Sequence, residues 1–350
     1  MTHHRGSSRV LILVTTILAS GSGFLMGSAV NIALPTIQSS LDVEIGIVQW
    51  IANAYALALS GLILLSGSLG DHYGVRRIYN TGILVFTFGA LASGLAPGAF
   101  SLIGARALQG VGAALMIPGS LAIINETFEE GERGRAIGLW AGVSGAIAAF
   151  GPFIGGFLAS VTWRLVFFAM VPLGLATLIV SLISIPRLRE TRWERLDLRG
   201  ASLILVALIA ISFGLIRLPE TTGVGVPHAM LGVGVVMLAV FIVAERRHPN
   251  PLVPFSMFTR IVAAANGATL LLYFAFQGAL FLLSFYLQQL LGQSPTAAGL
   301  SLLPATAIIA LFSAPSGSLT DRRGPRTQMI AGPLLVTAGL LETMDSEGEL

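Results

Sequence analysis

The sequence predicts an all-α polytopic membrane protein. Hydrophobic residues make up 54% of its 350 residues and charged residues only 11%, and the mean hydropathy is +0.83. A soluble domain carries about 25% charged residues. A bilayer-spanning helix needs roughly 20 mostly apolar residues, and apolar runs of that length recur along the chain. We therefore expect ten complete transmembrane helices followed by a partial eleventh.

The predicted helices fall into three groups. Residues 1–186 are expected to form an N-terminal six-helix bundle, with apolar runs at 10–34, 47–69, 78–95, 100–124, 137–159 and 165–185. Residues 187–260 should supply two cytoplasmic connections and two extra transmembrane helices, at 201–218 and 227–244. Residues 261–350 are interpreted as an incomplete C-terminal bundle, with helices at 261–287 and 297–319.

The last apolar run, residues 329–341, is too short to cross a bilayer at about 1.5 Å of rise per residue. One interpretation is a half-inserted or interfacial helix. The interpretation we favour is a chain cut short within a span, which gives the partial eleventh helix.

The basic residues, all of them arginine, predict the orientation. With the N-terminus inside, seventeen of the twenty fall in cytoplasmic segments and two fall outside. This bias is typical of a multi-pass protein of the cell membrane with a cytoplasmic N-terminus, and it explains the basic pI through lipid rather than nucleic acid. The expected partner is therefore the lipid bilayer. With no cysteine in the chain, disulfides and thiolate metal sites are excluded, and no cofactor or metal is expected.

A polar turn occurs twice, as GSLGDHYGVRR at residues 67–77 and as GSLTDRRGPR at residues 317–326. Such a repeat indicates internal duplication. Asp71 and Asp321 each lie at the C-terminal end of a helix, where the macrodipole disfavours negative charge, so each should have a cationic or helix N-terminal partner. An ordinary turn is the weaker interpretation. The charged residues of the two turns considered below are Asp71, Arg76, Arg77, Asp321 and Arg322.

Four predicted helices, the first, second, fourth and ninth, carry polar residues along one face. Buried polar groups in hydrocarbon are costly unless they are paired or face water, so a shared polar cavity is expected. The alternative is hydrogen bonding between neighbouring helices, which suits the first two helices equally well. The candidate cavity residues are Asn31, Asn53, Gln109, Tyr273, Gln277 and Ser284.

Arg106 is the only ionisable side chain well inside a complete predicted span. A charge at the centre of a bilayer helix costs roughly 2.5–3.5 kcal/mol on insertion scales, so Arg106 is a functional candidate. The alternative is that its side chain snorkels to the nearer interface.

Glycines gather on the fifth predicted helix. Small residues let helix backbones approach closely, and proline removes a helix hydrogen bond and bends the helix. Tight packing and a seam that shifts during a conformational cycle both fit this pattern. The residues concerned are Gly138, Gly151, Pro152, Gly155 and Gly156.

Taken together, these motifs resemble the major facilitator superfamily, and specifically its fourteen-span drug:proton antiporters. Residues 67–77 are similar to the superfamily's loop between helices two and three. The fourth helix matches the family pattern at Arg106, Gln109, Gly110 and Gly112, and the fifth matches at the residues above, although Ile147 replaces a glycine. Asn31 to Pro35, Trp50 and Tyr55 are similar to the first- and second-helix patterns. The two extra helices favour the fourteen-span group.

The resemblance implies the major facilitator fold, in which two bundles rock around a central site and give alternating access. It also implies a cytoplasmic gate at Asp71, Arg76, Arg77, Asp321 and Arg322, in which the two acids latch the bundles. By the same resemblance, Arg106 takes part in proton coupling, and substrates are small amphipathic compounds or drugs. One departure is Met26, which stands where the family usually has an aspartate. Proton coupling is therefore implied by the resemblance alone.

The function we expect is secondary active export of small amphipathic compounds, with protons as the coupling ion that the resemblance implies. The alternative is a truncated, non-transporting membrane protein that assembles with or regulates a full-length transporter. An enzyme is not expected, because the chain places no acid, histidine or thiol deep within a complete span.

Overall fold

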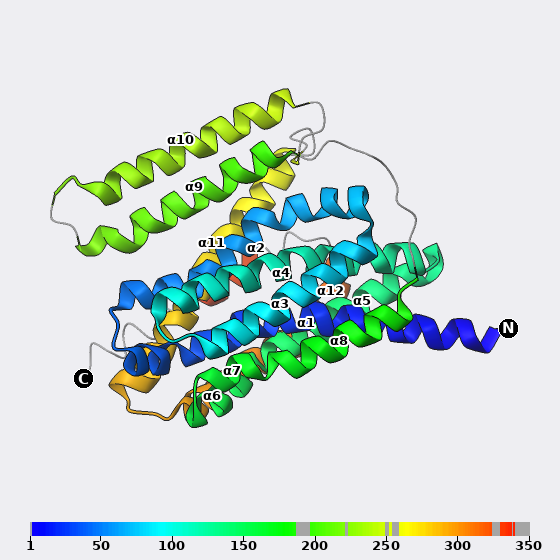
Figure 1. The fold of residues 1–350 in the computed structure, drawn as a ribbon, viewed down its shortest axis with the longest axis horizontal. Coiled ribbons are helices and arrows are strands. Elements are labelled where there is room, and N and C mark those ends of the chain that lie inside the picture. The colour runs from blue at the N-terminus through cyan, green and yellow to red at the C-terminus, as the bar shows by residue number, and fades with distance from the viewer. Residues whose placement is uncertain are drawn as a thin grey trace.

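A computed structural model describes residues 2–186, 197–220, 223–248, 252–253, 259–323, 330–337 and 339. The regular elements in these ranges are all helical (Figure 1). Their bounds are α1 Thr2–Leu41, α2 Ile45–Tyr73, α3 Val75–Leu95, α4 Ala99–Thr127, α5 Glu130–Ala149, α6 Gly151–Val161, α7 Arg164–Phe168, α8 Met170–Ser184, α9 Leu198–Arg217, α10 Val226–Arg247, α11 Arg260–Phe285 and α12 Pro295–Arg323. A 3₁₀ turn at Leu218–Glu220 follows α9, and a π turn at Tyr286–Leu290 follows α11.

The helices match the predicted spans closely. Nine stretches of the described chain are long and apolar enough to cross a membrane, and they coincide with the first nine predicted helices. The helix α12 lies where the tenth was predicted. Residues 330–337 are helical at the predicted partial eleventh, and the remainder of that run, apart from residue 339, lies outside the described residues.

Two predicted helices are interrupted. The fifth is divided into α5 and α6 at Phe150, and Pro152 stands in the first turn of α6, as expected for a residue that lacks a backbone N–H. The sixth is divided into α7 and α8 at Ala169, whose N–H still donates to the Leu165 carbonyl at 2.9 Å. The first helix is longer than predicted and continues through Pro35 to Leu41.

The helices α1 to α8 surround one apolar core that includes Met26, Tyr79, Phe86 and Phe167, all buried. The helices α2 and α3 both pack against α4. Gly74, between α2 and α3, has φ +90°, a backbone conformation that glycine adopts at little cost. This explains the glycine at the centre of the first polar turn.

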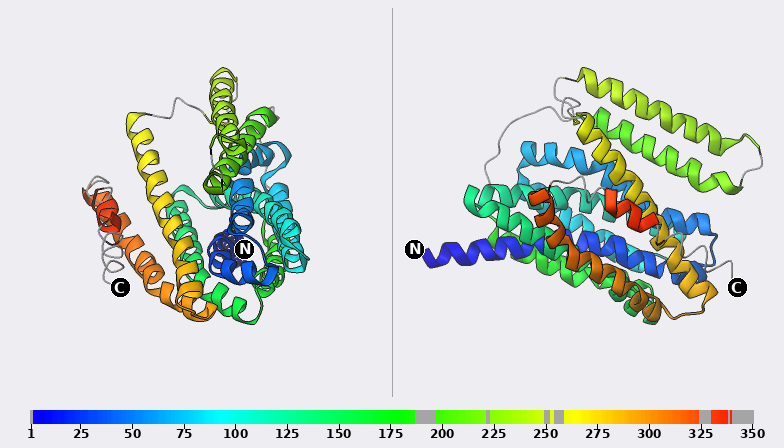
Figure 2. Two further views of the ribbon diagram at one scale, coloured as in Figure 1. Left: turned by 90° about the vertical axis from the view of Figure 1, so that its left-hand side faces the viewer. Right: turned by 180° about the vertical axis from the view of Figure 1, so that it is seen from behind.

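The extra helices α9 and α10 form an antiparallel hairpin outside the first bundle (Figures 1 and 2). The hairpin packs on α2, where Leu205 covers Gly61 and the rings of Trp50 and Phe213 lie 6.3 Å apart. The helix α12 packs on α6, and α11 contacts α1. The start of the second half therefore rests on the first and fifth predicted helices.

Candidate functional site

Arg106 points into the first bundle and is only 1% exposed. Its Nη1 donates to the side-chain oxygen of Gln109 at 2.7 Å, and its Nε donates to the Ile51 carbonyl at 3.4 Å. The guanidinium carbon lies 4.4 Å from the centre of the Tyr55 ring and 5.9 Å from that of Phe167. The side chain therefore does not snorkel to the interface.

The charge of Arg106 is balanced by dipoles and ring faces rather than by an acid. Between described residues, the ion pairs are those of Arg9 with Glu129 and Glu132. A buried cation without a counter-ion is costly, and contact with an aromatic ring recovers roughly 0.5–2 kcal/mol of that cost. The surroundings of Arg106 therefore favour a ligand that brings an anionic or hydrogen-bond-accepting group.

Gln109 adds a second donor beside Arg106. Its side chain is buried and its oxygen accepts from Arg106, which leaves Nε2 buried without a hydrogen-bond partner. Leaving a buried donor unpaired costs roughly 1–3 kcal/mol. The pair is thus prepared to donate to one acceptor group. Tyr55 is held in place because its hydroxyl donates to the Gly23 carbonyl at 2.9 Å.

A buried network of hydroxyl groups connects α1, α4 and α5. Ser20 donates to Ser120 at 2.9 Å, Ser120 donates to the Thr16 carbonyl at 3.3 Å, and the Trp140 indole donates to Ser20 at 3.1 Å. At Ser20 and Ser120 the polar stripes therefore join helices to one another, whereas the Thr16 hydroxyl donates to the Leu13 carbonyl of its own helix. The sequence analysis missed Trp140, although a buried indole N–H usually requires an acceptor.

The remaining candidate cavity residues differ in exposure, and no contact given for the described residues links them to Arg106. Asn31 and Asn53 are half-buried. Ser284 is buried, and its hydroxyl donates to the Leu280 carbonyl of its own helix. Tyr273 is 62% exposed and Gln277 is exposed.

The helix α11 contacts the first bundle near its C-terminal end, where Phe281 and Phe285 pack on the core, and further contacts come from the turn that follows. There Gln288 donates to the Ile32 carbonyl at 2.7 Å and Gln289 donates to Gln38 at 2.8 Å. These two glutamines come from the π turn that follows α11.

The described gate residues make contacts within the first bundle. Arg76 donates to the Leu182 carbonyl of α8 at 2.7 Å, and Arg77 is exposed. Asp71 is exposed, and its charge repels that of Glu126 at the end of α4. The backbones of Asp321 and Arg322 belong to the last turn of α12, and their side chains lie outside the described part of the structure.

The glycine motif forms a close seam at α6. A Cβ on Gly155 would lie 2.8 Å from the Ala29 Cα of α1, and one on Gly156 would meet the Pro295 backbone of α12. From the opposite side, a Cβ on Gly299 would lie 3.1 Å from the Phe153 Cα. Gly151 and Pro152 are also buried.

Gly138 differs from the close packing expected for this motif. It is exposed, and nothing lies within 4 Å of a Cβ placed on it. The close approach is made by the α6 part of the motif instead.

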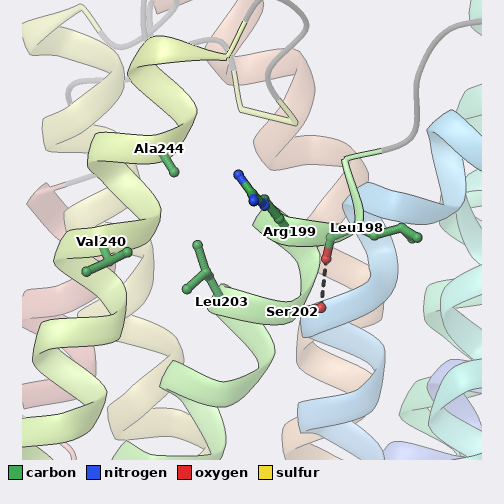
Figure 3. Close-up of a pocket in the computed structure, with 6 residues that line it drawn as sticks. All are labelled: Leu198, Arg199, Ser202, Leu203, Val240 and Ala244. Carbon is green, nitrogen blue, oxygen red and sulfur yellow. Dashed lines mark hydrogen bonds between the residues drawn. The ribbon is translucent and has the colours of Figure 1, made fainter.

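A crevice of about 560 Å³ lies between α9 and α10, outside the first bundle (Figure 3). Apolar side chains dominate its lining, with Arg199 and Ser202 from the first turns of α9. It lies on the hairpin rather than beside Arg106, so it is not the predicted cavity.

Comparisons with known proteins agree with this architecture. The chain is 36% identical to the tetracenomycin C resistance and export protein of Streptomyces glaucescens, over 95% of this chain and 64% of that protein. It is 36% identical to the multidrug resistance protein Stp of Mycobacterium tuberculosis, over 95% of this chain and 63% of that one. It is 38% identical to the puromycin resistance protein pur8 of Streptomyces alboniger, over 95% of this chain and 66% of that protein. The chain thus spans less than two thirds of the length of these relatives.

Among solved structures, the fold is similar to that of the peptide transporter POT in complex with sulfate, with a TM-score of 0.62 and 15% identity over 91% of this chain and 69% of that one. The three relatives above are named as resistance proteins, and the first of them also as an export protein. The sequence model of the Major Facilitator Superfamily matches residues 16–343. The chain belongs to the Major Facilitator Superfamily.

Proposed function

We propose that this chain is the larger part of a secondary exporter of small amphipathic compounds in the cell membrane, with protons as the coupling ion. The observation that carries the export proposal is the Arg106–Gln109 pair, a buried cation and a spare donor with no acid partner among the described residues. The choice of protons rests on the family resemblance. Resistance and export among relatives that match 95% of the chain supports the same activity.

The proposed transport site contains Arg106, Gln109 and Tyr55 from the first bundle. We propose that the half-buried Asn31 and Asn53, together with Tyr273, Gln277 and Ser284 of α11, complete it when the second bundle is whole. In this scheme residues 1–186 form one rocking body, residues 261–350 begin the other, and residues 187–260 connect them. This is the arrangement of a fourteen-span carrier.

We further propose that the seam between α6 and its neighbours α1 and α12 changes during the transport cycle. Its contacts are made by backbone atoms across Gly155, Gly156 and Gly299, so small shifts need no side-chain rearrangement. Asp71 and Asp321, with the arginines that follow them, would close the cytoplasmic side in one of the two states.

Dye accumulation in an efflux-deficient bacterial host tests the proposal. The chain is expressed alone and as a chimera extended with the C-terminal helices of the tetracenomycin C relative, each with Arg106 or Arg106→Ala. We expect the chimera to lower accumulation of an acceptor-rich or anionic dye more than that of a permanently cationic dye, and Arg106→Ala to abolish the effect. Arg260→Ala, which removes an exposed arginine, is the matched control.

The chain expressed alone distinguishes the second candidate, a non-transporting subunit that assembles with a full-length relative. That candidate requires no efflux by the chain alone and co-purification with the relative. Normal efflux by the Arg106→Ala chimera contradicts the proposed role of Arg106.

The proposed orientation is tested by thiol labelling, since the chain has no cysteine of its own. A cysteine at Asp42, exposed between α1 and α2, should react with an impermeant reagent applied to intact cells. A cysteine at Glu130, exposed at the start of α5, should react only after the membrane is opened. The reverse pattern contradicts a cytoplasmic N-terminus.

A further inference from the structure

Two buried carboxyl groups face each other where α9 begins and α10 ends. Asp197 precedes the first residue of α9 and is 7% exposed, and Glu245 in the last turn of α10 is 1% exposed. A Cβ on Gly200 would lie 2.5 Å from Oε1 of Glu245 and 2.8 Å from Oδ2 of Asp197. The two acids therefore meet across the same glycine.

Each acid already has one backbone partner. Oδ1 of Asp197 accepts from the Gly200 N–H at 2.8 Å, which caps the N-terminus of α9. Oε2 of Glu245 accepts from the Val253 N–H at 2.9 Å, which ties α10 to the connection that follows it. Both carboxyl groups are thus fixed in place rather than free to turn away from each other.

Among the described residues, no donor lies between the facing oxygens. Oε1 of Glu245 is buried without a hydrogen-bond partner, although it and Oδ2 of Asp197 lie 2.5 Å and 2.8 Å from the same Cβ position on Gly200. Two ionised carboxylates are both acceptors, and they repel each other when they are shielded from water. One proton held between them would supply the missing donor and remove one of the two charges.

We propose that Asp197 and Glu245 form a proton-binding site, in which one shared proton fastens the end of the α9–α10 hairpin to the connection at residues 252–253. The site is outside the first bundle and does not depend on the proposed export function. Its ligand is a proton, and its effect is local closure of this end of the hairpin.

Other charged groups flank the pair in the sequence. His248 lies three residues after Glu245 in the chain. When its imidazole is charged it favours the ionised form of Glu245, so it opposes proton sharing at acid pH. Arg199, Arg246 and Arg247 are exposed and keep a constant charge across the neutral range. A His248→Gln variant therefore separates imidazole titration from titration of the acid pair.

Thiol labelling of the purified full chain in detergent tests closure directly. Leu252→Cys is the reporter, because the Leu252 side chain reaches to 3.1 Å from the Cβ position of Gly200. Val224→Cys, at a residue that is 93% exposed at the other end of the hairpin, corrects for the pH dependence of thiol reactivity. We expect the rate at Leu252→Cys, divided by the rate at Val224→Cys, to rise roughly tenfold from acid to alkaline pH, because the shared proton is lost. A tenfold change is equivalent to about 1.4 kcal/mol of local opening.

Two variants assign the effect to the pair. Glu245→Gln places an amide N–H where the shared proton would lie, so the labelling ratio should stay low at every pH. Asp197→Asn keeps a residue that caps helices well and should also flatten the profile. Asp42→Asn, an exposed acid, should leave the profile unchanged. Infrared difference spectra should show a protonated carboxyl band that disappears in Glu245→Gln.

Three results would overturn the assignment. The first is a labelling ratio that does not change with pH in the unmodified pair. The second is a ratio that rises toward acid pH, which would mean that the acids hold a cation rather than a proton. The third is a wild-type profile in both Glu245→Gln and Asp197→Asn. Efflux measurements are not needed, so the outcome is independent of the export proposal.

Discussion

Replacing Arg106 by methionine should leave the fold nearly as stable as before while it removes export. Methionine keeps much of the side-chain length without the charge. The buried guanidinium contacts Gln109, the Ile51 carbonyl and the Tyr55 ring, and it has no acid partner among the described residues. The question is whether these contacts outweigh the cost of burying the charge.

The gains and losses are of similar size. The 2.7 Å hydrogen bond to Gln109 is worth roughly 1.5–3 kcal/mol, because its donor is charged. The 3.4 Å contact with the Ile51 carbonyl is too long to add much, and the cation–π contact adds roughly 0.5–2 kcal/mol. Relief from holding an arginine in the membrane interior returns roughly 2.5–3.5 kcal/mol. The free energy of unfolding should therefore change by less than about 3 kcal/mol, whereas breaking a buried ion pair costs about 3–5 kcal/mol.

The remaining loss in Arg106→Met should come from Gln109, whose side chain is then buried without its partner. Adding Gln109→Leu removes that stranded amide, so the double variant should recover stability that the single variant lost. Thermal unfolding of the purified chains in one detergent, followed by size-exclusion chromatography, measures both. A large loss that Gln109→Leu does not restore would show that Arg106 is a structural residue and would refute this reasoning.

Two further variants test the seam and the hydroxyl network. Gly155→Ala should lower the thermal midpoint, because its Cβ would press on the Ala29 backbone and overpacking costs about 1–3 kcal/mol. Gly138→Ala, in open space, should leave the midpoint unchanged or raise it slightly. Equal effects of the two substitutions would argue against the seam. Ser20→Ala should lower the free energy of unfolding by about 1–3 kcal/mol, because it leaves the buried Trp140 indole without an acceptor. An unchanged thermal midpoint would show that the hydroxyl network contributes little to stability.

Hydropathy predicts the helices well because a bilayer requires a nearly fixed length of apolar chain. The interruption at Phe150 was also accessible from sequence, since Pro152 cannot donate a backbone hydrogen bond. The length of α1 was not. Its charged beginning counts against a span, yet Arg9 pairs with Glu129 at 3.0 Å and with Glu132 at 2.8 Å, and both partners lie more than a hundred residues away.

The candidate site was predictable only in part. A lone arginine in an apolar run is conspicuous, but snorkelling and inward burial differ little in energy, and only the position of Tyr55 on α2 decides between them. The polar stripes posed the same difficulty. Ser20 and Asn31 share one face of α1, yet Ser20 bonds to α4 and α5 while Asn31 is half-buried. Helical periodicity predicts which residues share one face of a helix, but not which other helix that face contacts.

Under the proposed export function, the charges of the first bundle limit the transport mechanism. Met26 is fully buried and has no proton to exchange, so a cycle that depends on an acid at that position cannot operate here. The ionisable group buried at the bundle centre is the cation Arg106. A ligand with an anionic or strongly accepting group lowers the cost of that charge, whereas a permanent cation raises it. Substrate choice should therefore follow the charge at Arg106, whichever ion drives the cycle.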